Sequence, residues 1–431
     1  DFFSLGNETL ILDESGRHNI LLLGEGDSDH DGTDLTDTIM IGSIDTKLKN
    51  VVLLSLPRDL YFLETQKMGK GRINSLYRNY KGVLMYKGEK DKEASSHAMQ
   101  QLANELSAIL GISIHETVKV DFTGFEQAID AIGGIDIDVP YDIEDTQFPG
   151  ANYAYETFQL SKGIQHLDGK TALKYARSRH TTSDFARSAR QQQIIEAAVR
   201  TLATKGLIHN IRKVTDLLKI ANSSIEMTST VSQIFALAKE IGNIEQWKFS
   251  QFTLSDRNGL YGEIAEAGGL LYSPPREQFE GAAVLLPVSV PEFPVTWKQP
   301  QVFANLIFQH RDFFTTAQPR IAILNASKKT GLASKLGNEL LRYGFNVVLM
   351  QNFDRNTPKP PLKESFITSV VPSDTMNMKH PAISFLETTF NLKSTSLGSL
   401  PPLRQPADIL IVLTEEYTFT PLQDLLETSK K

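Results

Sequence analysis

Five short segments hold many Asp and Arg residues beside the expected ends of strands and helices. They are residues 24–37, 55–59, 72–77, 175–179 and 184–191. Arg offers a planar fork of donors to phosphate oxygens and keeps its charge, so several Arg side chains in one cleft would hold a pyrophosphate rigidly. The segments together predict an anion site suited to phosphoryl transfer, which depends on positioning and on neutralising charge.

Carboxylates in the first segment predict a Mg²⁺ site beside the Arg cluster, because Mg²⁺ prefers carboxylate and phosphate oxygens. Asp37 fits that role together with Asp27, Asp31 or Asp34. A sugar hydroxyl needs a base to become a nucleophile, and Arg stays protonated. We therefore expect an Asp of residues 24–37 to be the base, unless the metal activates the hydroxyl, and we expect His180 to be dispensable.

Taken singly, each segment has an ordinary structural interpretation. Arg177 and Arg179 suit a helix C-terminus, where positive charge is favourable. Arg187 and Arg190 lie three residues apart on a helix and suit a surface ion network. Residues 27–37 could form a solvated acidic loop.

Composition restricts the classes of function. The chain of 431 residues has a formal net charge of -7, which argues against a general nucleic-acid binder, so we expect no nucleic-acid partner. The absence of Cys excludes disulfides and Cys-based nucleophiles or metal sites. Because the net charge is negative, any phosphate site must be a local cluster of Arg.

Apolar periodicity alternates between strand-like and helix-like segments, which predicts the α/β class. Strands are expected at 19–23, 38–44, 51–56, 116–120 and 135–139, and helices at 97–110, 122–132, 168–179 and 187–202. The second and third strands should form a hairpin. Residues 146–158, which contain Pro149 and Gly150, are expected to be a loop.

A composition shift at 315–319 predicts a linker between two domains. The first domain is expected at 1–314, with its motifs within 19–200, and a small α/β domain at 320–431. No segment approaches the roughly 18 to 20 apolar residues that span a bilayer. Because the chain starts at Asp1 without a leader, we expect an N-terminal membrane anchor to precede it.

Seven motifs, in this order, closely resemble the LytR-CpsA-Psr family. They are Leu-Leu-Leu-Gly (21–24), Leu-Thr-Asp-Thr-Ile-Met (35–40), Ser-Leu-Pro-Arg-Asp (55–59), Arg-Ile-Asn-Ser-Leu-Tyr (72–77), Gly-Gly-Ile-Asp-Ile-Asp-Val-Pro (133–140), Leu-Asp-Gly-Lys-Thr-Ala-Leu-Lys-Tyr-Ala-Arg-Ser-Arg (167–179) and Asp-Phe-Ala-Arg-Ser-Ala-Arg-Gln-Gln (184–192). The segments 320–327, 330–334, 343–345 and 407–413 resemble the accessory LytR C-terminal domain. The resemblance implies a mixed central sheet flanked by helices.

The resemblance also implies a function. Members of this family transfer wall teichoic acids, capsule polysaccharides or related glycopolymers from a polyprenyl-pyrophosphate carrier to peptidoglycan, usually with Mg²⁺. They act at the extracytoplasmic face of the cell membrane. This chain is accordingly expected to be a glycopolymer phosphotransferase with a lipid-linked polymer as donor and peptidoglycan as acceptor.

Site residues carry over motif by motif. The resemblance implies that Asp37 is associated with the metal, and that Asp37, Arg58, Arg177 and Arg179 are catalytic. The implied pyrophosphate ligands are Arg58, Arg177, Arg179, Arg187, Arg190 and Gln191.

One departure concerns the second metal ligand. Many members have Gly-x-Asp after the first strand, where this chain has Gly24-Glu25-Gly26, so Asp27, Asp31 and Asp34 all remain candidates. His30 is a further candidate for the second metal ligand, although its position also suits an ordinary loop residue. The family's prenyl tunnel would draw on apolar residues that could equally be core, namely Leu102, Leu106, Phe122, Phe125, Ile129, Ile194 and Val199.

Two other functions remain open from the sequence. The same site could hydrolyse the pyrophosphate if water replaced the sugar hydroxyl. It could also serve a non-catalytic module that binds polyprenyl phosphate or the envelope. Neither the polymer nor the length of the lipid follows from the residues.

Overall fold

The computed structural model describes residues 9–26, 34–150, 154–178, 184–206, 224–241, 246–256, 269–288, 296–315, 318–353, 363–370, 380–395 and 403–428. Its contacts divide the chain into two compact units. Unit 1 comprises Asp1–Ser255 and Ser273–Leu286, and unit 2 comprises Asp256–Tyr272 and Pro287–Lys431. Within the described ranges, no helix is both long and apolar enough to cross a membrane.

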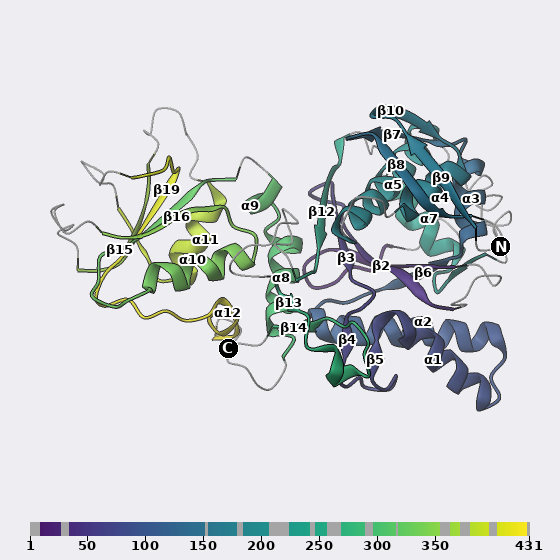
Figure 1. The fold of residues 1–431 in the computed structure, drawn as a ribbon, viewed down its shortest axis with the longest axis horizontal. Coiled ribbons are helices and arrows are strands. Elements are labelled where there is room, and N and C mark those ends of the chain that lie inside the picture. The colour runs from purple at the N-terminus through teal and green to yellow at the C-terminus, as the bar shows by residue number, and fades with distance from the viewer. Residues whose placement is uncertain are drawn as a thin grey trace. The chain divides into compact units, whose positions relative to one another are not determined.

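Unit 1 is built on a mixed sheet of six strands in the order β11-β6-β1-β2-β3-β12 (Figure 1). Its strands are β1 (His18–Glu25), β2 (Thr36–Asp45), β3 (Asn50–Leu56), β6 (Glu116–Val120), β11 (Ile225–Met227) and β12 (Lys248–Thr253). The expected hairpin is confirmed, since β2 and β3 pair antiparallel. Strand β1 runs parallel to β6, and β3 runs parallel to β12.

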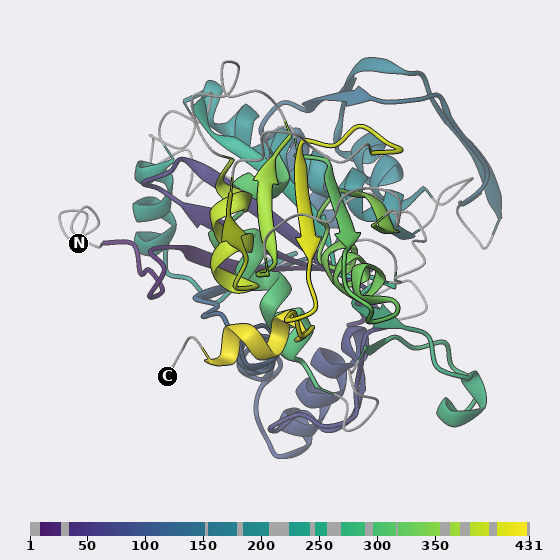
Figure 2. The same cartoon turned by 90° about the vertical axis from the view of Figure 1, so that its left-hand side faces the viewer.

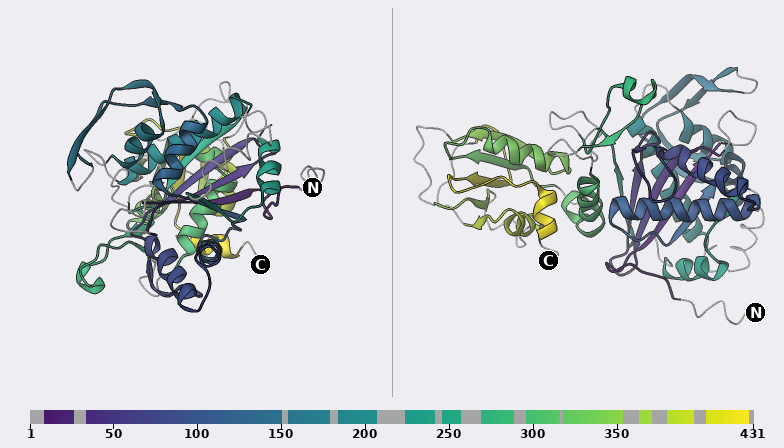
Figure 3. Two further views of the ribbon diagram at one scale, coloured as in Figure 1. Left: turned by 90° about the vertical axis from the view of Figure 1, so that its right-hand side faces the viewer. Right: turned by 90° about the horizontal axis from the view of Figure 1, so that it is seen from below.

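Helices cover both faces of this sheet. They are α1 (Ile73–Tyr86), α2 (Asp91–Leu110), α3 (Phe122–Ala131), α4 (Gly169–Arg177), α5 (Asp184–Thr204) and α7 (Val231–Glu240). Figure 3 (right) shows α1 and α2 crossing one face, where α1 contacts β2 and α2 contacts β6. On the other face, Ile195 of α5 packs with Met40 and Leu53 of the sheet.

Short strand pairs surround the sheet. They are β4 (Tyr61–Phe62) with β5 (Gly71–Arg72), β7 (Ile135–Val139) with β10 (Gly163–Leu167), and β8 (Ile143–Pro149) with β9 (Tyr155–Leu160). The pair β8 and β9 contradicts the expected loop at 146–158. Phe148 and Phe158 are buried there and contact each other, so the pair has its own apolar contact.

Unit 2 contains a five-stranded sheet in the order β16-β15-β19-β17-β18, with yellow β19 in the middle (Figure 2). Its strands are β15 (Ile321–Asn325), β16 (Val347–Asn352), β17 (Phe366–Ser369), β18 (Lys393–Ser394) and β19 (Ile409–Leu413). Its helices are α8 (Lys298–Gln309), α9 (Asp312–Thr315), α10 (Leu332–Arg342), α11 (Pro381–Thr389) and α12 (Leu422–Thr428). Further short elements among the described residues are β13 (Leu271–Tyr272), the 3-10 helix Arg276–Phe279 and β14 (Leu286–Pro287).

The expected α/β class with a mixed central sheet and a C-terminal α/β region is confirmed. The domain boundary at 315–319 stays a prediction. Helix α8 contacts α12 and α9 contacts α11, so residues 287–315 group with unit 2, whereas the sequence assigns them to the first domain.

A glycine sets the spacing between α3 and α4, and a substitution tests it. A Cβ at Gly169 would lie 2.2 Å from the carbonyl oxygen of Glu126, whereas a Cβ at Gly82 in α1 would meet nothing within 4 Å. We expect Gly169→Ala to lower the free energy of unfolding by about 1 to 3 kcal/mol. Gly82→Ala should raise it by about 0.5 to 1 kcal/mol through helix propensity. Urea denaturation measures both, and equal stability of Gly169→Ala and the wild type would contradict the close packing.

Candidate active site

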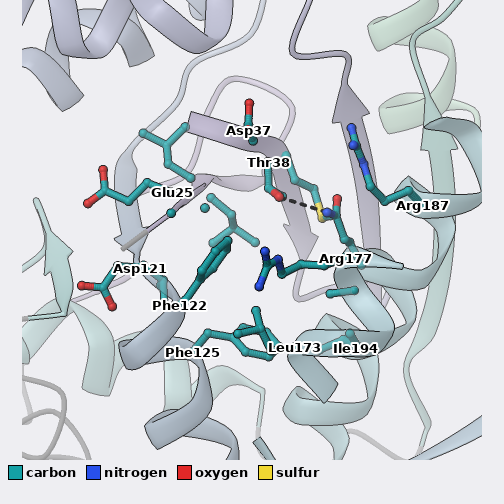
Figure 4. Close-up of a pocket in the computed structure, with 18 of the residues that line it drawn as sticks. Glu25, Asp37, Thr38, Asp121, Phe122, Phe125, Leu173, Arg177, Arg187 and Ile194 are labelled. Atoms are coloured by element: carbon teal, nitrogen blue, oxygen red, sulfur yellow. Dashed lines mark hydrogen bonds between the residues drawn. The ribbon is translucent and has the colours of Figure 1, made fainter. Parts of the chain in front are cut away.

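A cavity of about 650 Å³ lies in unit 1 between the sheet and the helices α3, α4 and α5 (Figure 4). Its polar lining includes Glu25, Asp37, Thr38, Asp121, Asp145, Arg177, Arg187 and Gln191. Its apolar lining includes Leu22, Met40, Val118, Val120, Phe122, Phe125, Leu173, Ile194 and Ile195. In Figure 4, Asp37, Thr38 and Arg187 lie at one end and Phe125, Leu173 and Ile194 at the other. The cavity therefore has a charged end and an apolar end.

Helix α5 supplies both polar and apolar side chains to the cavity, because the helical repeat places them on one face. Arg187, Gln191, Ile194 and Ile195 follow one another at spacings of four, three and one residues, which places them on one helical face. The Gln191 Nε2 donates a hydrogen bond of 3.0 Å to the hydroxyl of Thr38 on β2. That bond links the helix to the sheet at the charged end of the cavity.

Helix α4 places Arg177, its last residue. Its N-terminus is held twice, because the backbone N–H of Thr171 donates to Asp168 Oδ1 at 2.8 Å and that of Gly169 donates to Asp130 Oδ1 at 2.7 Å. Asp168 is thus an N-cap, and Asp130 anchors α4 to α3. With its start fixed and nine residues to its end, α4 brings Arg177 into the cavity.

Asp37 and Arg58 meet although 21 residues separate them. The guanidinium of Arg58 lies 3.5 Å from Asp37 Oδ1, and the buried Asn74 donates from Nδ2 to the same oxygen at 3.3 Å. The backbone N–H of Asn74 also donates to the carbonyl of Arg58 at 3.4 Å. The predicted segments 24–37, 55–59 and 72–77 therefore converge at one point.

Arg190 has a different position from the other predicted pyrophosphate ligands. It is 4% exposed, and its guanidinium donates to the carbonyl oxygens of Tyr175, at 3.0 Å, and Ser178. Those carbonyls belong to the end of α4, where a helix leaves its last acceptors unsatisfied. Arg190 thereby joins α5 to α4 and is absent from the residues that line the cavity.

Several predicted residues lie outside the described ranges. They are Asp27, His30, Asp31, Arg179 and His180. Of the predicted convergence, Arg177 and Arg187 line one cavity, and Arg58 contacts Asp37, which lines it as well. The metal-binding and base roles stay predictions.

Asp145 is a cavity residue that the sequence analysis missed. It is 4% exposed, and it accepts hydrogen bonds from the Ser178 hydroxyl at 3.1 Å and the Gln147 N–H at 3.2 Å. It stands directly before residues 146–158, whose turn residues predict a loop, so no local pattern indicates a buried carboxylate there. A buried carboxylate next to an Arg-containing helix end would have been recognisable only from the pairing of β8 with β9.

A buried ion network lies beside the cavity on the strand ends. The ammonium of Lys119 contacts Glu25 at 2.7 Å and Glu226 at 2.8 Å, and Ser95 donates to Glu226 at 2.5 Å. Burial raises the pKa of Glu25, and Lys119 offsets this only in part. Burial opposes the charge of Lys119, but Tyr77 and the two carboxylates outweigh it, so its pKa is raised. Lys119 thus stays charged and fixes the end of β1.

A Mg²⁺ site needs oxygen ligands, and Asp37 offers a carboxylate at the charged end of the cavity. The described residues contain no group of three or more His, Asp or Glu arranged to hold a metal. Asp37 is half exposed, and the contacts recorded for it within the described ranges all go to Oδ1. One open carboxylate at the charged end of a cavity fits Mg²⁺, which takes few protein ligands and completes its shell with phosphate oxygens and water.

The candidate tunnel residues divide into two groups. Phe122, Phe125 and Ile194 line the cavity. The others are core: Leu102 and Leu106 are fully buried in α2, Ile129 belongs to a second apolar cluster, and Val199 packs with Met40 and Leu53.

Comparison with family models identifies the chain. Residues 6–278, more than half of it, match the LytR_cpsA_psr family, and residues 318–416 match the LytR cell envelope-related transcriptional attenuator domain. The chain therefore belongs to the LytR_cpsA_psr family, as the seven motifs predict.

Individual relatives match over shorter stretches. The polyisoprenyl-teichoic acid–peptidoglycan teichoic acid transferase TagV of Bacillus subtilis (strain 168) is 30% identical over 206 residues, 47% of each chain. The transferase of this kind named TagU from Oceanobacillus iheyensis is 31% identical over 210 residues, 48% of this chain and 58% of that protein. This chain thus matches about half the length of these relatives. The crystal structure of B. subtilis TagV superposes with a TM-score of 0.47 at 23% identity, covering 69% of this chain and 99% of that one.

The N-cap of α4 gives a pH-dependent prediction. Hydrogen bonds from the side chain and backbone of Thr171 lower the pKa of Asp168. The ionised cap therefore stabilises the fold fully above the unfolded pKa of about 3.9, and this contribution is lost as the pH falls through the lowered folded pKa. Asp168→Ala should cost about 1 kcal/mol at neutral pH, and its deficit against the wild type should shrink in acid.

Asp168→Asn is the matched control, because Asn caps a helix but does not titrate. It should match the wild type at neutral pH and exceed it in acid. Urea unfolding of the three proteins at several pH values measures this. A deficit of Asp168→Ala that is the same at every pH would contradict the assignment.

Proposed function

We propose that this chain is a phosphotransferase that moves a glycopolymer from a polyprenyl-pyrophosphate carrier to peptidoglycan or a related cell-wall acceptor, at the extracytoplasmic face of the cell membrane. Membership of the LytR_cpsA_psr family supports the proposal, as do the relatives named teichoic acid transferases. The observation that carries it is the two-ended cavity. Arg187 lies with Asp37 at one end, Arg177 lies between the ends beside Phe122, and apolar side chains form the other end (Figure 4), an arrangement that suits an anionic headgroup with a hydrocarbon tail.

The charged end would bind the pyrophosphate. Arg177 and Arg187 come from different helices, and each offers a fork of N–H donors that matches phosphate oxygens. Arg58 stands beside Asp37 and would add a third cation. Their charge stays fixed at any physiological pH, so the site needs no protonation to bind its donor.

The reaction is a displacement at the phosphorus that carries the polymer. The acceptor hydroxyl oxygen bonds to this phosphorus, and the bond from phosphorus to the bridging oxygen breaks. The bridging oxygen leaves on the lipid as prenyl monophosphate, whose growing negative charge the Arg side chains stabilise. The proton of the hydroxyl passes to a carboxylate of residues 24–37. The products are a phosphodiester to the acceptor and the lipid phosphate.

Asp37 is the described residue that would hold Mg²⁺, with phosphate oxygens and water completing the shell. The bound ion would neutralise charge on the transferring phosphoryl group. Asn74 keeps the Asp37 carboxylate in place through its 3.3 Å bond.

Turnover with and without acceptor tests the proposed function. Purified protein would be incubated with a lipid-linked glycopolymer and Mg²⁺, either alone or with peptidoglycan oligomers. We expect polymer joined covalently to peptidoglycan, together with prenyl monophosphate, only when the acceptor is present. Release of polymer at the same rate without acceptor would show a hydrolase, and bound donor without any product would show a binding module.

The two cavity arginines give a prediction with a surface control. Arg177→Ala and Arg187→Ala should each lower kcat/KM for the donor by roughly 10-fold to 100-fold, because each removes charge-assisted hydrogen bonds to phosphate. Arg78→Ala, on an exposed position of α1, should stay within about twofold of the wild type. Initial rates measured over donor concentration decide between these outcomes. Unchanged kinetics in both cavity variants would contradict the binding of pyrophosphate at this end of the cavity.

Metal dependence gives a second prediction. Asp37→Asn keeps the size of the side chain and removes its charge, so the Mg²⁺ concentration for half-maximal turnover should rise by roughly tenfold or more. Chelation should abolish turnover of the wild type, and added Mg²⁺ should restore it. Full activity of Asp37→Ala in the presence of chelator would show that the reaction needs no metal.

A further inference from the structure

The guanidinium of Arg177 lies against two aromatic rings. Its Cζ is 4.3 Å from the ring centroid of Phe122 and 5.4 Å from that of Phe148. Phe122 is the first residue of α3, and Phe148 belongs to β8. Figure 4 shows the Phe122 ring beside the Arg177 side chain, facing the cavity. Three elements that are distant in sequence thus meet at one cation.

Such stacking orients a guanidinium in a particular way. An aromatic face attracts the cation through its quadrupole, and Arg stacks flat against the ring. A stacked contact of this kind uses the face of the guanidinium, whereas phosphate oxygens bind its N–H edge. Arg190 combines the two kinds of contact, because its Cζ lies 5.9 Å from the ring centroid of Tyr175 while its N–H groups donate to the carbonyls of Tyr175 and Ser178. A ring can therefore hold Arg177 without competing with an anion.

The two rings differ in what surrounds them. Phe148 is 2% exposed and also contacts Phe158, so it belongs to the core beneath the site. Phe122 is only half buried and lines the cavity itself. Its backbone follows Asp121, which caps α3 by accepting the Gly124 N–H at 2.7 Å, so the ring starts from a fixed helix end.

We propose that Phe122 is a positioning residue that acts through Arg177, stacking the guanidinium so that its N–H edge meets the pyrophosphate of the donor. The proposal rests on the proposed function in one respect, namely that Arg177 contacts the donor's phosphate. It assigns Phe122 to recognition of the headgroup, although the residue is apolar and lines a cavity suited to a hydrocarbon tail.

Phe125 provides the matched control. It lies three residues further along α3 and lines the same cavity. Within the described part of the chain, the rings recorded over Arg177 are those of Phe122 and Phe148. A ring that serves only as apolar wall should therefore behave like Phe125.

The experiment measures binding of inorganic pyrophosphate to the full chain by calorimetry in the presence of Mg²⁺. This probe has no prenyl tail, so loss of apolar wall alone should not affect it. We expect Phe122→Leu to weaken binding roughly 3-fold to 10-fold. Phe122→Tyr and Phe125→Leu should stay within about twofold of the wild type. Equal losses for Phe122→Leu and Phe125→Leu would overturn the proposal.

A double-mutant cycle separates positioning from a general effect on structure. In the Arg177→Ala background, Phe122→Leu should cause no further loss, because the partner of the ring is gone. The same loss in both backgrounds would overturn the proposal. If Arg177→Ala alone leaves pyrophosphate binding unchanged, both the positioning role and the phosphate role of Arg177 fail. If Arg177→Ala weakens binding and Phe122→Leu does not, only the positioning role fails.

Fluorinated phenylalanines at position 122 test the same contact even if the Phe122→Leu variant folds poorly. Each added fluorine withdraws charge from the face of the ring while nearly preserving its shape. Pyrophosphate affinity should fall stepwise from phenylalanine to its mono-, di- and trifluoro derivatives. Constant affinity across this series would contradict a cation–π contact.

Discussion

The close approach of α4 to α3 at Gly169 is the constraint on which the charged end of the cavity depends. A side chain at that position would collide with the Glu126 carbonyl at 2.2 Å, so only glycine lets the two helices pack at this distance. The N–H of Gly169 then reaches Asp130, and α4 extends from that anchor to Arg177. At the far end, Arg190 ties the last carbonyls of α4 to α5. The relative placement of Arg177 and Arg187 follows from these contacts.

The distribution of charge explains how a chain with a net charge of -7 can hold an anion. Coulomb interactions at close range inside a cleft outweigh a modest overall charge that salt screens. The carboxylates of Glu25 and Glu226 are held by Lys119. Asp145 accepts hydrogen bonds from Ser178 and Gln147 beside the cavity. Asp37 remains half exposed at the charged end, where a cation can reach it.

Much of the fold follows from the sequence because its signals are strong. The strands of the sheet carry continuous apolar runs, and α2 ends at Gly111 in the left-handed conformation. The pair β8 and β9 escaped prediction because turn residues dominate the segment and, within the described residues, the two strands pair only with each other. The second domain was predicted from strand and helix periodicity, but the membership of α8 and α9 depends on contacts with α12 and α11 that no local pattern encodes.

The sequence predicts those residues of the site that belong to its motifs. Arg177, Arg187 and Gln191 were expected at one site, and helical spacing explains the last two. The position of Arg190 was not predictable, because the choice between a phosphate and the open carbonyls of α4 depends on how two helices meet. The stacking of Phe122 on Arg177 joins residues 55 positions apart, whereas the sequence alone predicts only an apolar role for Phe122.

In the proposed function, one cavity holds both the pyrophosphate and the start of the prenyl tail. A crystal structure with a short prenyl pyrophosphate and Mg²⁺ tests it most directly. The account predicts phosphates in contact with Arg177 and Arg187, and a hydrocarbon chain that runs along Phe125, Leu173 and Ile194. A headgroup bound elsewhere, or a chain directed away from these apolar residues, would contradict it.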